Sequence, residues 1–488
     1  MQKKISRREF LKGAAASSLA LLSIVPSPEV TLASGVPEIT LLAPKVDAKY
    51  FDGDLIAEAL DSYVYSVIGA HIRLSFIESE KYERMLYKYE ITDNLPDVFY
   101  IRSSSQIASL RESGSLLSLN SLLEENGQEL KATIGDDAIS LHSKNGDIYA
   151  LPCLHDRAYR LSFEYRVRIA EDNGLNMDAI KDMTDLTEVF DELAELSPDI
   201  IACSETDAYQ TWDSLSDNLG VLMDLGQPAT VVNLYETAEY EAYCKIVYNW
   251  VENNYLLSDD TGMILLNKYV KSPEIFGKIA NYHPGLPYVD GADAGEEIAC
   301  VSLSESFLTT DFMKINAYAI SSSSQHPEIA MQFLNLMYTD ANVMNLLTYG
   351  IEGVHYQVID EENGVIDYAD GVTSETSGYA QFRSYFWGNQ FLTYTWAGYP
   401  TDLWEQIQEY NDTALRSVAY GFTYDSSPVE AEVSACASIV DEYQELLQAG
   451  VGDPDVILAE FREKLKAAGI DTIIAEKQRQ LDEYLAGE

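Results

Sequence analysis

Glu38-Ile-Thr-Leu-Leu-Ala43 begins the stretch that decides the fold, and its apolar run predicts a short buried strand. Residues 53–68 repeat apolar side chains at helical spacing, whereas residues 72–76 alternate apolar and polar side chains as a strand does. A second helix is expected at 79–91, and Asp97-Val-Phe-Tyr-Ile101 indicates a third strand. Strand, helix, strand, helix, strand is typical of a parallel sheet with right-handed crossovers, so this stretch predicts an α/β fold.

If the strand order of this stretch is 2-1-3, the first and third strands are neighbours. Their crossovers then lie on opposite faces of the sheet, and a crevice opens beyond their carboxyl ends. The loops that line this crevice would be Val46–Asp52 and Arg102–Gln106. A second interpretation stays open, in which Arg102-Ser-Ser-Ser105 only caps the next helix.

Length and charge narrow the class of protein. A chain of 488 residues is too long for one hydrophobic core, so about two or three domains are expected. The formal charge of −47 repels phosphate backbones and anionic lipid, so nucleic acid is not an expected partner. The 33 tyrosines suit wet interfaces and sugar-binding clefts, although compositional bias explains them equally well.

The sequence contains no recognisable catalytic or metal-binding motif, and no cofactor or metal is expected. The six histidines show no ligand spacing, and HExxH, Gly-x-Ser-x-Gly and phosphate-cradling glycine loops are absent. Pairs of acids suited to a glycosidase occur throughout so acidic a chain, so they favour no enzyme. Buried single thiols are expected, and one disulfide stays open. The five cysteines, which form no CxxC pair, are Cys153, Cys203, Cys244, Cys300 and Cys436.

The N-terminus predicts export. Ser6-Arg7-Arg8-Glu-Phe-Leu-Lys12 resembles the twin-arginine export signal, and the apolar stretch from Gly13 to Val25 is too short to span a bilayer. Cleavage is expected near Thr31-Leu-Ala33. The sequence has no cysteine before Cys153, so a lipid anchor at the cleavage site is not expected. We therefore expect the chain in the periplasm or at the extracellular face of the cytoplasmic membrane, either free or held by an uncleaved signal.

Later segments predict the remaining elements. Gly146–Pro152 is expected to cross between domains, and Asp311–Ile320 to form a strand. His326-Pro327 opens a strong helix, with proline at its first turn. Residues 453–485 are helical by periodicity, with a break at Gly469.

Residues 315–340 contain Asn-Ala, then a Pro-Glu helix, then Thr-Asp, and this order resembles the family-1 extracellular solute-binding proteins of bacterial ABC importers. Members share that return of the chain into the first lobe. Three further stretches, at 345–356, 387–394 and 466–481, resemble a LipO-like subfamily that has its own C-terminal domain of unknown function. With residues 38–152, the resemblance covers nearly the whole chain after the signal.

The resemblance implies a two-lobed, type II periplasmic-binding-protein-like fold with discontinuous lobes and a helical C-terminal extension. It implies a monomeric importer component that is no enzyme, captures a small polar ligand by hinge closure and docks on permease subunits. The ligand would be an oligosaccharide, neutral or acidic; a secreted glycosidase-like enzyme and a ligand-sensing surface protein are alternatives. The expected boundaries are 1–35 for the signal peptide, 36–152 plus 312–358 for lobe 1, 153–311 plus 359–450 for lobe 2, and 451–488 for the C-terminal helices.

Matching the family by position gives candidate ligand contacts. Sugar binding needs flat aromatic faces and a few placed polar groups, and arginines among them would suit an acidic sugar. Each candidate also has a structural interpretation: Tyr209 and Trp212 share a helical face, Asp156 and Arg157 can form an ion pair, and the C-terminal tryptophans are typical of a core. The candidates are Arg102, Ser103, Ser104, Asp156, Arg157, Tyr209, Trp212, Tyr282, Trp387, Asn389 and Trp396.

Overall fold

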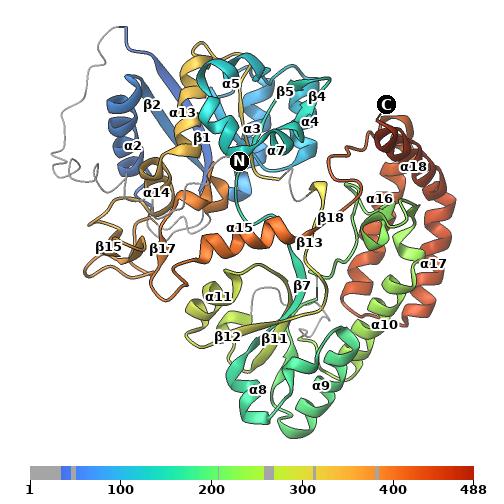
Figure 1. The fold of residues 1–488 in the computed structure, drawn as a ribbon. Helices are drawn as coiled ribbons and strands as arrows, with labels where there is room; N and C mark the ends of the chain where they lie inside the picture. The colour runs from blue at the N-terminus through green and yellow to red at the C-terminus, as the bar shows by residue number, and fades with distance from the viewer. Residues whose placement is uncertain are drawn as a thin grey trace. The chain divides into compact units, whose positions relative to one another are not determined.

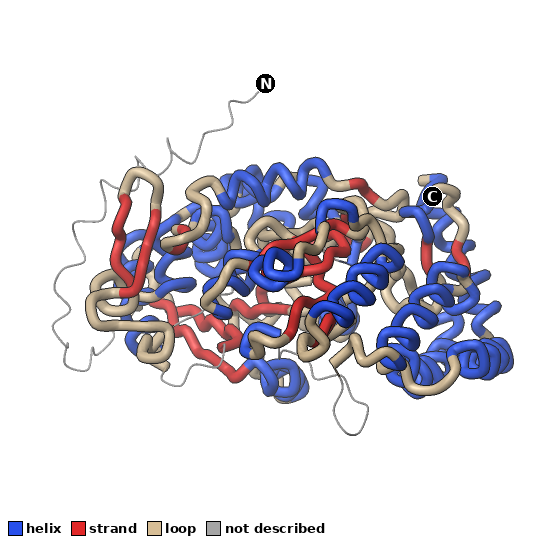
Figure 2. The backbone as a smooth tube through the Cα atoms, turned by 90° about the horizontal axis from the view of Figure 1, so that it is seen from below, coloured by secondary structure: helices blue, strands red, loops and turns tan. Residues whose placement is uncertain are grey.

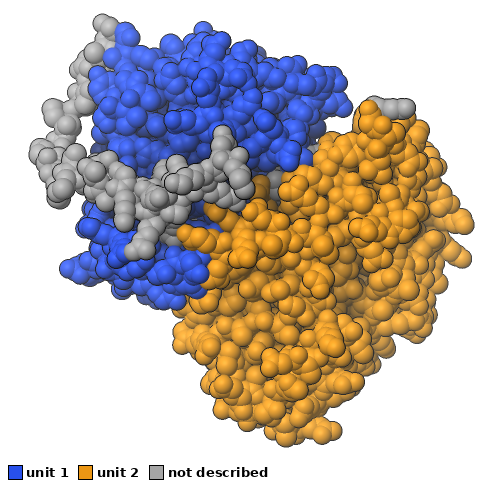
Figure 3. Space-filling model, in the orientation of Figure 1, with its two compact units in different colours: residues 1–155, 313–404 blue, residues 156–312, 405–488 orange. Residues whose placement is uncertain are grey.

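The chain folds into two compact units, each assembled from separated segments. Unit 1 comprises Met1–His155 and Met313–Trp404, and unit 2 comprises Asp156–Phe312 and Glu405–Glu488 (Figure 3). The chain therefore passes between the units three times. The computed structural model describes residues 35–45, 51–206, 208–257, 269–311, 315–379 and 384–487.

Unit 1 is built on a five-stranded mixed sheet in which one strand runs antiparallel to both of its neighbours (Figure 1). Its strands, in spatial order, are β2 (His71–Glu78), β1 (Glu38–Lys45), β3 (Val98–Ile101), β14 (Ala317–Ile320) and β6 (Leu151–Pro152). β1 pairs in parallel with both β2 and β3, so the first three strands have the order 2-1-3. β14 runs antiparallel to β3, so it begins at the edge where β3 ends. Every residue of β3 and β14 is buried, as expected for strands covered on both faces.

Helices cover both faces of this sheet. The two crossovers are α2 (Gly53–Ile68) and α3 (Ser79–Ile91), which match the predicted segments. Because both crossovers are right-handed, they lie on opposite faces. α2 ends at Gly69, whose φ of 70° gives a left-handed C-cap. The other helices of unit 1 are α4 (Ser104–Glu112), α5 (Asn120–Asn126), α6 (Gln128–Ile134), α7 (Asp136–Ser140), α13 (Pro327–Thr339) and α14 (Ala341–Tyr349).

Residues 359–404 belong to unit 1, whereas the expected boundary assigned them to lobe 2. Backbone contacts hold this segment in unit 1: the Leu154 N–H donates to the Gly388 carbonyl at 2.8 Å. A small sheet also holds this segment in unit 1, because its first strand spans position 359 and pairs with strands that follow it. Sequence periodicity does not report such long-range backbone pairing. The strands of this sheet are β15 (Tyr356–Asp360), β16 (Val365–Tyr368) and β17 (Thr395–Trp396).

Unit 2 contains a second mixed sheet. Its strands, in spatial order, are β12 (Ile298–Ser302), β7 (Arg160–Arg166), β11 (Ile275–Tyr282) and β8 (Ile201–Cys203). β7 is antiparallel to both of its neighbours, so it begins at the edge where β11 and β12 end. Helices of this unit include α8 (Val167–Asn173), α9 (Met183–Leu196), α10 (Ala238–Glu252), α11 (Leu286–Ala294) and α15 (Leu403–Thr413), the last of which begins in unit 1.

The C-terminal helices pack into the core of unit 2, where they lie beside one another (Figure 2). The Phe461 ring lies 4.7 Å from the ring of Tyr235. Lys477 is fully buried, and its Nζ binds the carboxylate of Asp217 and the carbonyl of Gly220. These contacts make residues 451–488 part of unit 2 rather than a separate extension. The helices are α16 (Glu430–Gln448), α17 (Pro454–Ala468) and α18 (Ile470–Ala486).

Several expectations concern single elements. All five cysteines are free thiols, and four of them are buried, as predicted. The strand expected at 311–320 is shorter, because β14 begins at Ala317. The export signal with Arg7 and Arg8, and residues 46–50 of the first crevice loop, lie outside the described residues. Among the helices that the structure describes, none is long and apolar enough to cross a bilayer.

Candidate functional site

The edge of the unit 1 sheet beyond β3 carries the first group of candidates. The Arg102 guanidinium donates to the Ser79 hydroxyl at 2.8 Å, and it lies 3.9 Å from the Glu83 carboxylate. Ser103 is the N-cap of α4, whose side chain accepts a hydrogen bond from the backbone N–H of Gln106 at 3.3 Å. The capping interpretation therefore describes Ser103, and Ser104 is the first residue of α4. Arg102 keeps 38% of its side chain exposed, so part of it can still meet a ligand.

A buried polar cluster lies at the same edge, and sequence reasoning missed it. Asn316, just before β14, has a φ of 59° and is 6% exposed. Its amide oxygen accepts a hydrogen bond from the Tyr100 hydroxyl, and its amide nitrogen lies 3.4 Å from Nε2 of His155. Its backbone N–H donates to the Arg102 carbonyl at 3.3 Å. The one available signal was the Asn-Ala pair at 316–317, because asparagine tolerates the left-handed region better than most residues.

Asp52, the residue before α2, is held by a histidine from the later part of unit 1. His355 Nδ1 accepts the backbone N–H of Ile351 at 2.9 Å, so its proton lies on Nε2, which is 3.2 Å from the Asp52 carboxylate. The backbone N–H of Asp52 donates to the Gly378 carbonyl at 2.8 Å. Burial lowers the pKa of His355, and the neighbouring Asp52 carboxylate only partly offsets that effect. His355 therefore acts as a neutral hydrogen-bond donor that positions the Asp52 carboxylate.

The corresponding edge of unit 2 gathers the second group of candidates. The Arg160 guanidinium stacks 4.2 Å from the ring centre of Tyr282 and 5.9 Å from that of Tyr410. The Tyr282 and Tyr410 rings meet edge to face, with 5.8 Å between their centres. Asp156 lies 3.9 Å from Nε2 of His283. A cation, two aromatic rings and a carboxylate thus converge where β11 ends and β7 begins.

Arg157 is held at this edge by its backbone rather than by its guanidinium. The N–H groups of Arg157 and Ala158 both donate to the Asn411 amide oxygen, at 2.8 and 2.9 Å. Within the described part of the chain, the buried Nε of Arg157 has no hydrogen-bond partner. Burial lowers the pKa of this guanidinium. A buried donor without a partner is costly, so an acceptor supplied by a ligand would be stabilising here.

The other candidates are structural residues. Trp212 is 4% exposed and donates to the Asn218 amide oxygen at 2.8 Å, and Tyr209 stacks on Tyr243 with 4.3 Å between ring centres. Both residues pack in or against the core of unit 2, as the structural interpretation expected, although residues 208–212 form no helix. Burial also raises the pKa of Tyr209.

The C-terminal candidates lie in unit 1. Trp387 is 1% exposed and packs edge to face against Phe76. Asn389 is buried, and its amide donates to the Tyr338 carbonyl at 3.0 Å. Trp396 is partly buried within the small sheet, 4.8 Å from the ring of Tyr368. Ligand contact is not proposed for these three residues.

The structure thus brings the candidates together as two groups. Arg102, Ser103 and Ser104 lie at the edge of the unit 1 sheet, whereas Asp156, Arg157 and Tyr282 lie at the edge of the unit 2 sheet. The candidate contacts predicted from the sequence did not include Arg160, Tyr410 or Asn411. No cluster of three or more metal-ligating side chains occurs among residues 35–487 wherever the structure describes them. Both edges offer hydrogen-bond donors and acceptors, and the unit 2 edge adds aromatic rings, which suits a polar ligand with apolar faces.

Comparisons with known proteins agree with this architecture. Residues 418–486 match the model of a domain of unknown function, DUF3502. A carbohydrate ABC transporter substrate-binding protein of Streptococcus pneumoniae is 23% identical over 443 residues, which cover 88% of each chain. The crystal structure of the N-glycan transport solute-binding protein NgtS from S. pneumoniae has a TM-score of 0.83 at 20% identity, covering 92% of this chain and 99% of that one.

A more distant structure gives the same fold. The alginate-binding protein AlgQ2 has a TM-score of 0.61 at 13% identity, covering 93% of this chain and all of that one. The chain therefore has the two-lobed α/β fold of the solute-binding proteins. It also carries the predicted C-terminal domain of unknown function, which includes all of α16, α17 and α18.

Proposed function

We propose that this chain is the substrate-binding component of an ABC importer and captures an oligosaccharide outside the cytoplasm. The observation that carries the proposal is the cluster at the unit 2 edge, where Arg160 stacks on Tyr282 and Tyr410 beside Asp156. Aromatic faces cover the apolar side of a sugar ring, and carboxylate and guanidinium groups bind its hydroxyls. NgtS, the carbohydrate-binding relative and AlgQ2 supply the ligand class by analogy.

The partners available to Arg157 and Arg160 bear on whether the sugar is neutral or acidic. The guanidinium of Arg160 is occupied by aromatic rings, and the Nε of Arg157 lacks an acceptor. A uronic acid would place a carboxylate on Arg157, whereas a neutral sugar would place a hydroxyl there. The formal charge of −47 raises the electrostatic cost of an anionic ligand, so a neutral glycan is the favoured one.

The transport role completes the proposal. The chain acts as an exported monomer, delivers the ligand to permease subunits and returns it chemically unchanged. Ligand binding draws the units together by a hinge motion at the chain crossings. Small-angle scattering would then give a smaller radius of gyration with ligand than without it.

Calorimetric titration against a glycan panel tests the proposal. The panel contains Man1GlcNAc and Man5GlcNAc, the ligands in two NgtS complexes, kestose, which occupies the S. pneumoniae protein FusA, and oligomeric alginate for the acidic class. We expect at least one member to bind with a Kd below about 1 mM. Mass spectrometry of the recovered glycan checks that it is intact. Recovery of cleaved glycan would show that the protein is an enzyme rather than a receptor. Absence of binding by every glycan of the panel would refute saccharide capture.

A further inference from the structure

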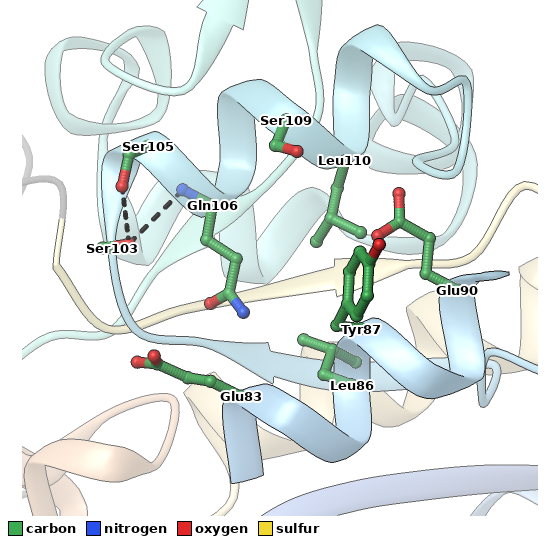
Figure 4. A pocket seen from close by; sticks show the side chains of 9 residues that line it. All are labelled: Glu83, Leu86, Tyr87, Glu90, Ser103, Ser105, Gln106, Ser109 and Leu110. Carbon is green, nitrogen blue, oxygen red and sulfur yellow. Dashed lines mark hydrogen bonds between the residues drawn. The ribbon is translucent and has the colours of Figure 1, made fainter. Parts of the chain in front are cut away.

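A pocket outside the two sheet edges lies between α3 and α4 of unit 1 (Figure 4). Its volume is about 320 Å³, which falls at the lower end of the range for small-molecule sites. Ser103, the N-cap of α4, belongs to its wall, so the pocket begins where the candidate loop Arg102–Ser104 ends. A ligand bound at the sheet edge could therefore continue into it.

The floor of this pocket is apolar and one wall is an exposed aromatic ring. Leu86 and Leu110 are buried at 1% and 3% exposure, and their side chains point toward the pocket (Figure 4). Tyr87 is 62% exposed, although it is a large aromatic residue beside two buried leucines. A flat ring left open to solvent above an apolar floor can stack on a ligand with its own apolar face.

Polar groups around the Tyr87 ring can form hydrogen bonds with the hydroxyl groups of a ligand. Gln106 accepts the backbone N–H of Arg102 through its amide oxygen at 3.3 Å, which leaves the NH₂ group for the pocket. In the described part of the chain, neither Ser109 Oγ nor the Tyr87 hydroxyl has a hydrogen-bond partner. Glu90 accepts the Ser113 hydroxyl through Oε1 at 2.7 Å and retains acceptor capacity at Oε2.

The charge of the lining residues favours a neutral ligand over an anionic one. Two carboxylates, those of Glu83 and Glu90, line the pocket; no lysine or arginine belongs to its lining, and the Arg102 guanidinium lies 3.9 Å from Glu83. A ligand with its own carboxylate or phosphate would be repelled, whereas neutral hydroxyls can donate charge-assisted hydrogen bonds to both acids. The pocket therefore combines a stacking face, free donors and anionic acceptors.

We propose that the pocket between α3 and α4 is an accessory subsite for one ring of a neutral oligosaccharide. Tyr87 stacks on the ring, while Gln106, Ser109 and Glu90 bind its hydroxyls. This inference rests on the proposed function and extends it, because glycans long enough to reach the pocket gain affinity from it and short ones do not. Selection by length thus resides in unit 1.

Substitution of Tyr87 tests the subsite. Titrations of Tyr87→Ala and Tyr87→Phe use Man5GlcNAc as the long glycan and Man1GlcNAc as the short one. We expect Tyr87→Ala to weaken the binding of Man5GlcNAc about tenfold and that of Man1GlcNAc less than about twofold. Tyr87→Phe keeps the ring and stays within about threefold of the wild type for both. Tyr65→Ala is the matched control, since Tyr65 is 46% exposed on α2, away from the pocket.

Each outcome of this test decides something. Equal affinities of Tyr87→Ala and the wild type for Man5GlcNAc would overturn the subsite and leave the proposed function intact. Equal losses for the long and short glycans would overturn length selection. Tighter binding of glucosamine oligomers than of neutral glycans, lost in Glu90→Gln, would make the pocket a cation site instead. Absence of binding by every glycan of the panel would refute the proposed function, and the subsite with it.

Discussion

The sheets of the two units differ in where their charged side chains lie. In unit 1 the central strands β3 and β14 are buried along their whole length and carry no charged residue, so polar groups gather at the edge. In unit 2 the even-numbered residues of β7 place Ser162, Glu164 and Arg166 on one face, opposite Lys278 of β11. The Arg160–Tyr282 pair continues this row to its end. The candidate site of unit 2 is therefore the open end of a buried polar ladder, whereas that of unit 1 is the rim of an apolar sheet.

The largest effect should come from removing the cation of this ladder. Lys278 Nζ lies 2.7 Å from Asp290 and 3.2 Å from Glu164, which is fully buried. Lys278→Met leaves the Asp290 carboxylate and the buried carboxyl group of Glu164 without their cation, and we expect it to lower the free energy of unfolding by about 3–5 kcal/mol. Urea unfolding followed by fluorescence measures the change. The exposed Lys271 supplies a control, Lys271→Met, and a similar small loss in both variants would contradict the ladder.

The second effect is a pH dependence. Burial raises the pKa of Glu164 from 4.5 to about 8, although the Lys278 ammonium opposes the shift. The folded state therefore holds a proton that the unfolded state has lost between these values, so the free energy of unfolding falls as pH rises through this window. Glu164→Gln removes the titrating group. From pH 5 to pH 8, the wild type should lose about 1–3 kcal/mol relative to this variant. Parallel stability curves for the two proteins would show that Glu164 does not titrate there.

A smaller effect is expected at the rim of unit 1. Asn316→Gly keeps the positive φ of 59° but removes the partner of the buried Tyr100 hydroxyl. We expect a loss of about 1–2 kcal/mol, and a larger loss for Asn316→Ala, because alanine tolerates this φ poorly. Thermal unfolding of both variants measures the order. An alanine variant as stable as the glycine variant would contradict the conformational part of this argument.

The smallest effect concerns the cap of α4. Ser103→Ala removes the acceptor for the Gln106 N–H, which should cost about 1 kcal/mol and increase hydrogen exchange in the first turn of α4. Ser103→Asp replaces the acceptor and should restore the protection. Unchanged exchange in Ser103→Ala would mean that the cap contributes nothing.

Local patterns predicted the elements well, whereas the sites depended on distant residues. The segments 53–68 and 79–91 form helices with those bounds, because apolar periodicity and capping act within a few residues. The strand order 2-1-3 depends on pairing between strands far apart in the sequence, and the structure supplies it. Asn316 and Tyr100 are 216 residues apart, and no local pattern links them. Asn411 likewise reaches Arg157 from 254 residues away.

Aromatic residues were the least predictable. Trp212, Trp387 and Tyr282 belong to similar aromatic-rich segments, but only Tyr282 reaches the end of a strand with its ring beside an arginine. Trp387 is covered by neighbours from other segments, and its burial follows from that tertiary packing rather than from its local sequence. Sequence therefore indicates where aromatic residues concentrate, and the sheet edges decide which of them can meet a ligand.

The central claim is that the open end of the unit 2 ladder binds a saccharide. Its most direct test is calorimetric titration of Tyr282→Ala beside Tyr484→Ala, an exposed tyrosine on α18 of the same unit. We expect Tyr282→Ala to bind the best glycan of the panel about tenfold more weakly than the wild type, and Tyr484→Ala to bind it as the wild type does. Wild-type affinity in Tyr282→Ala would contradict the account.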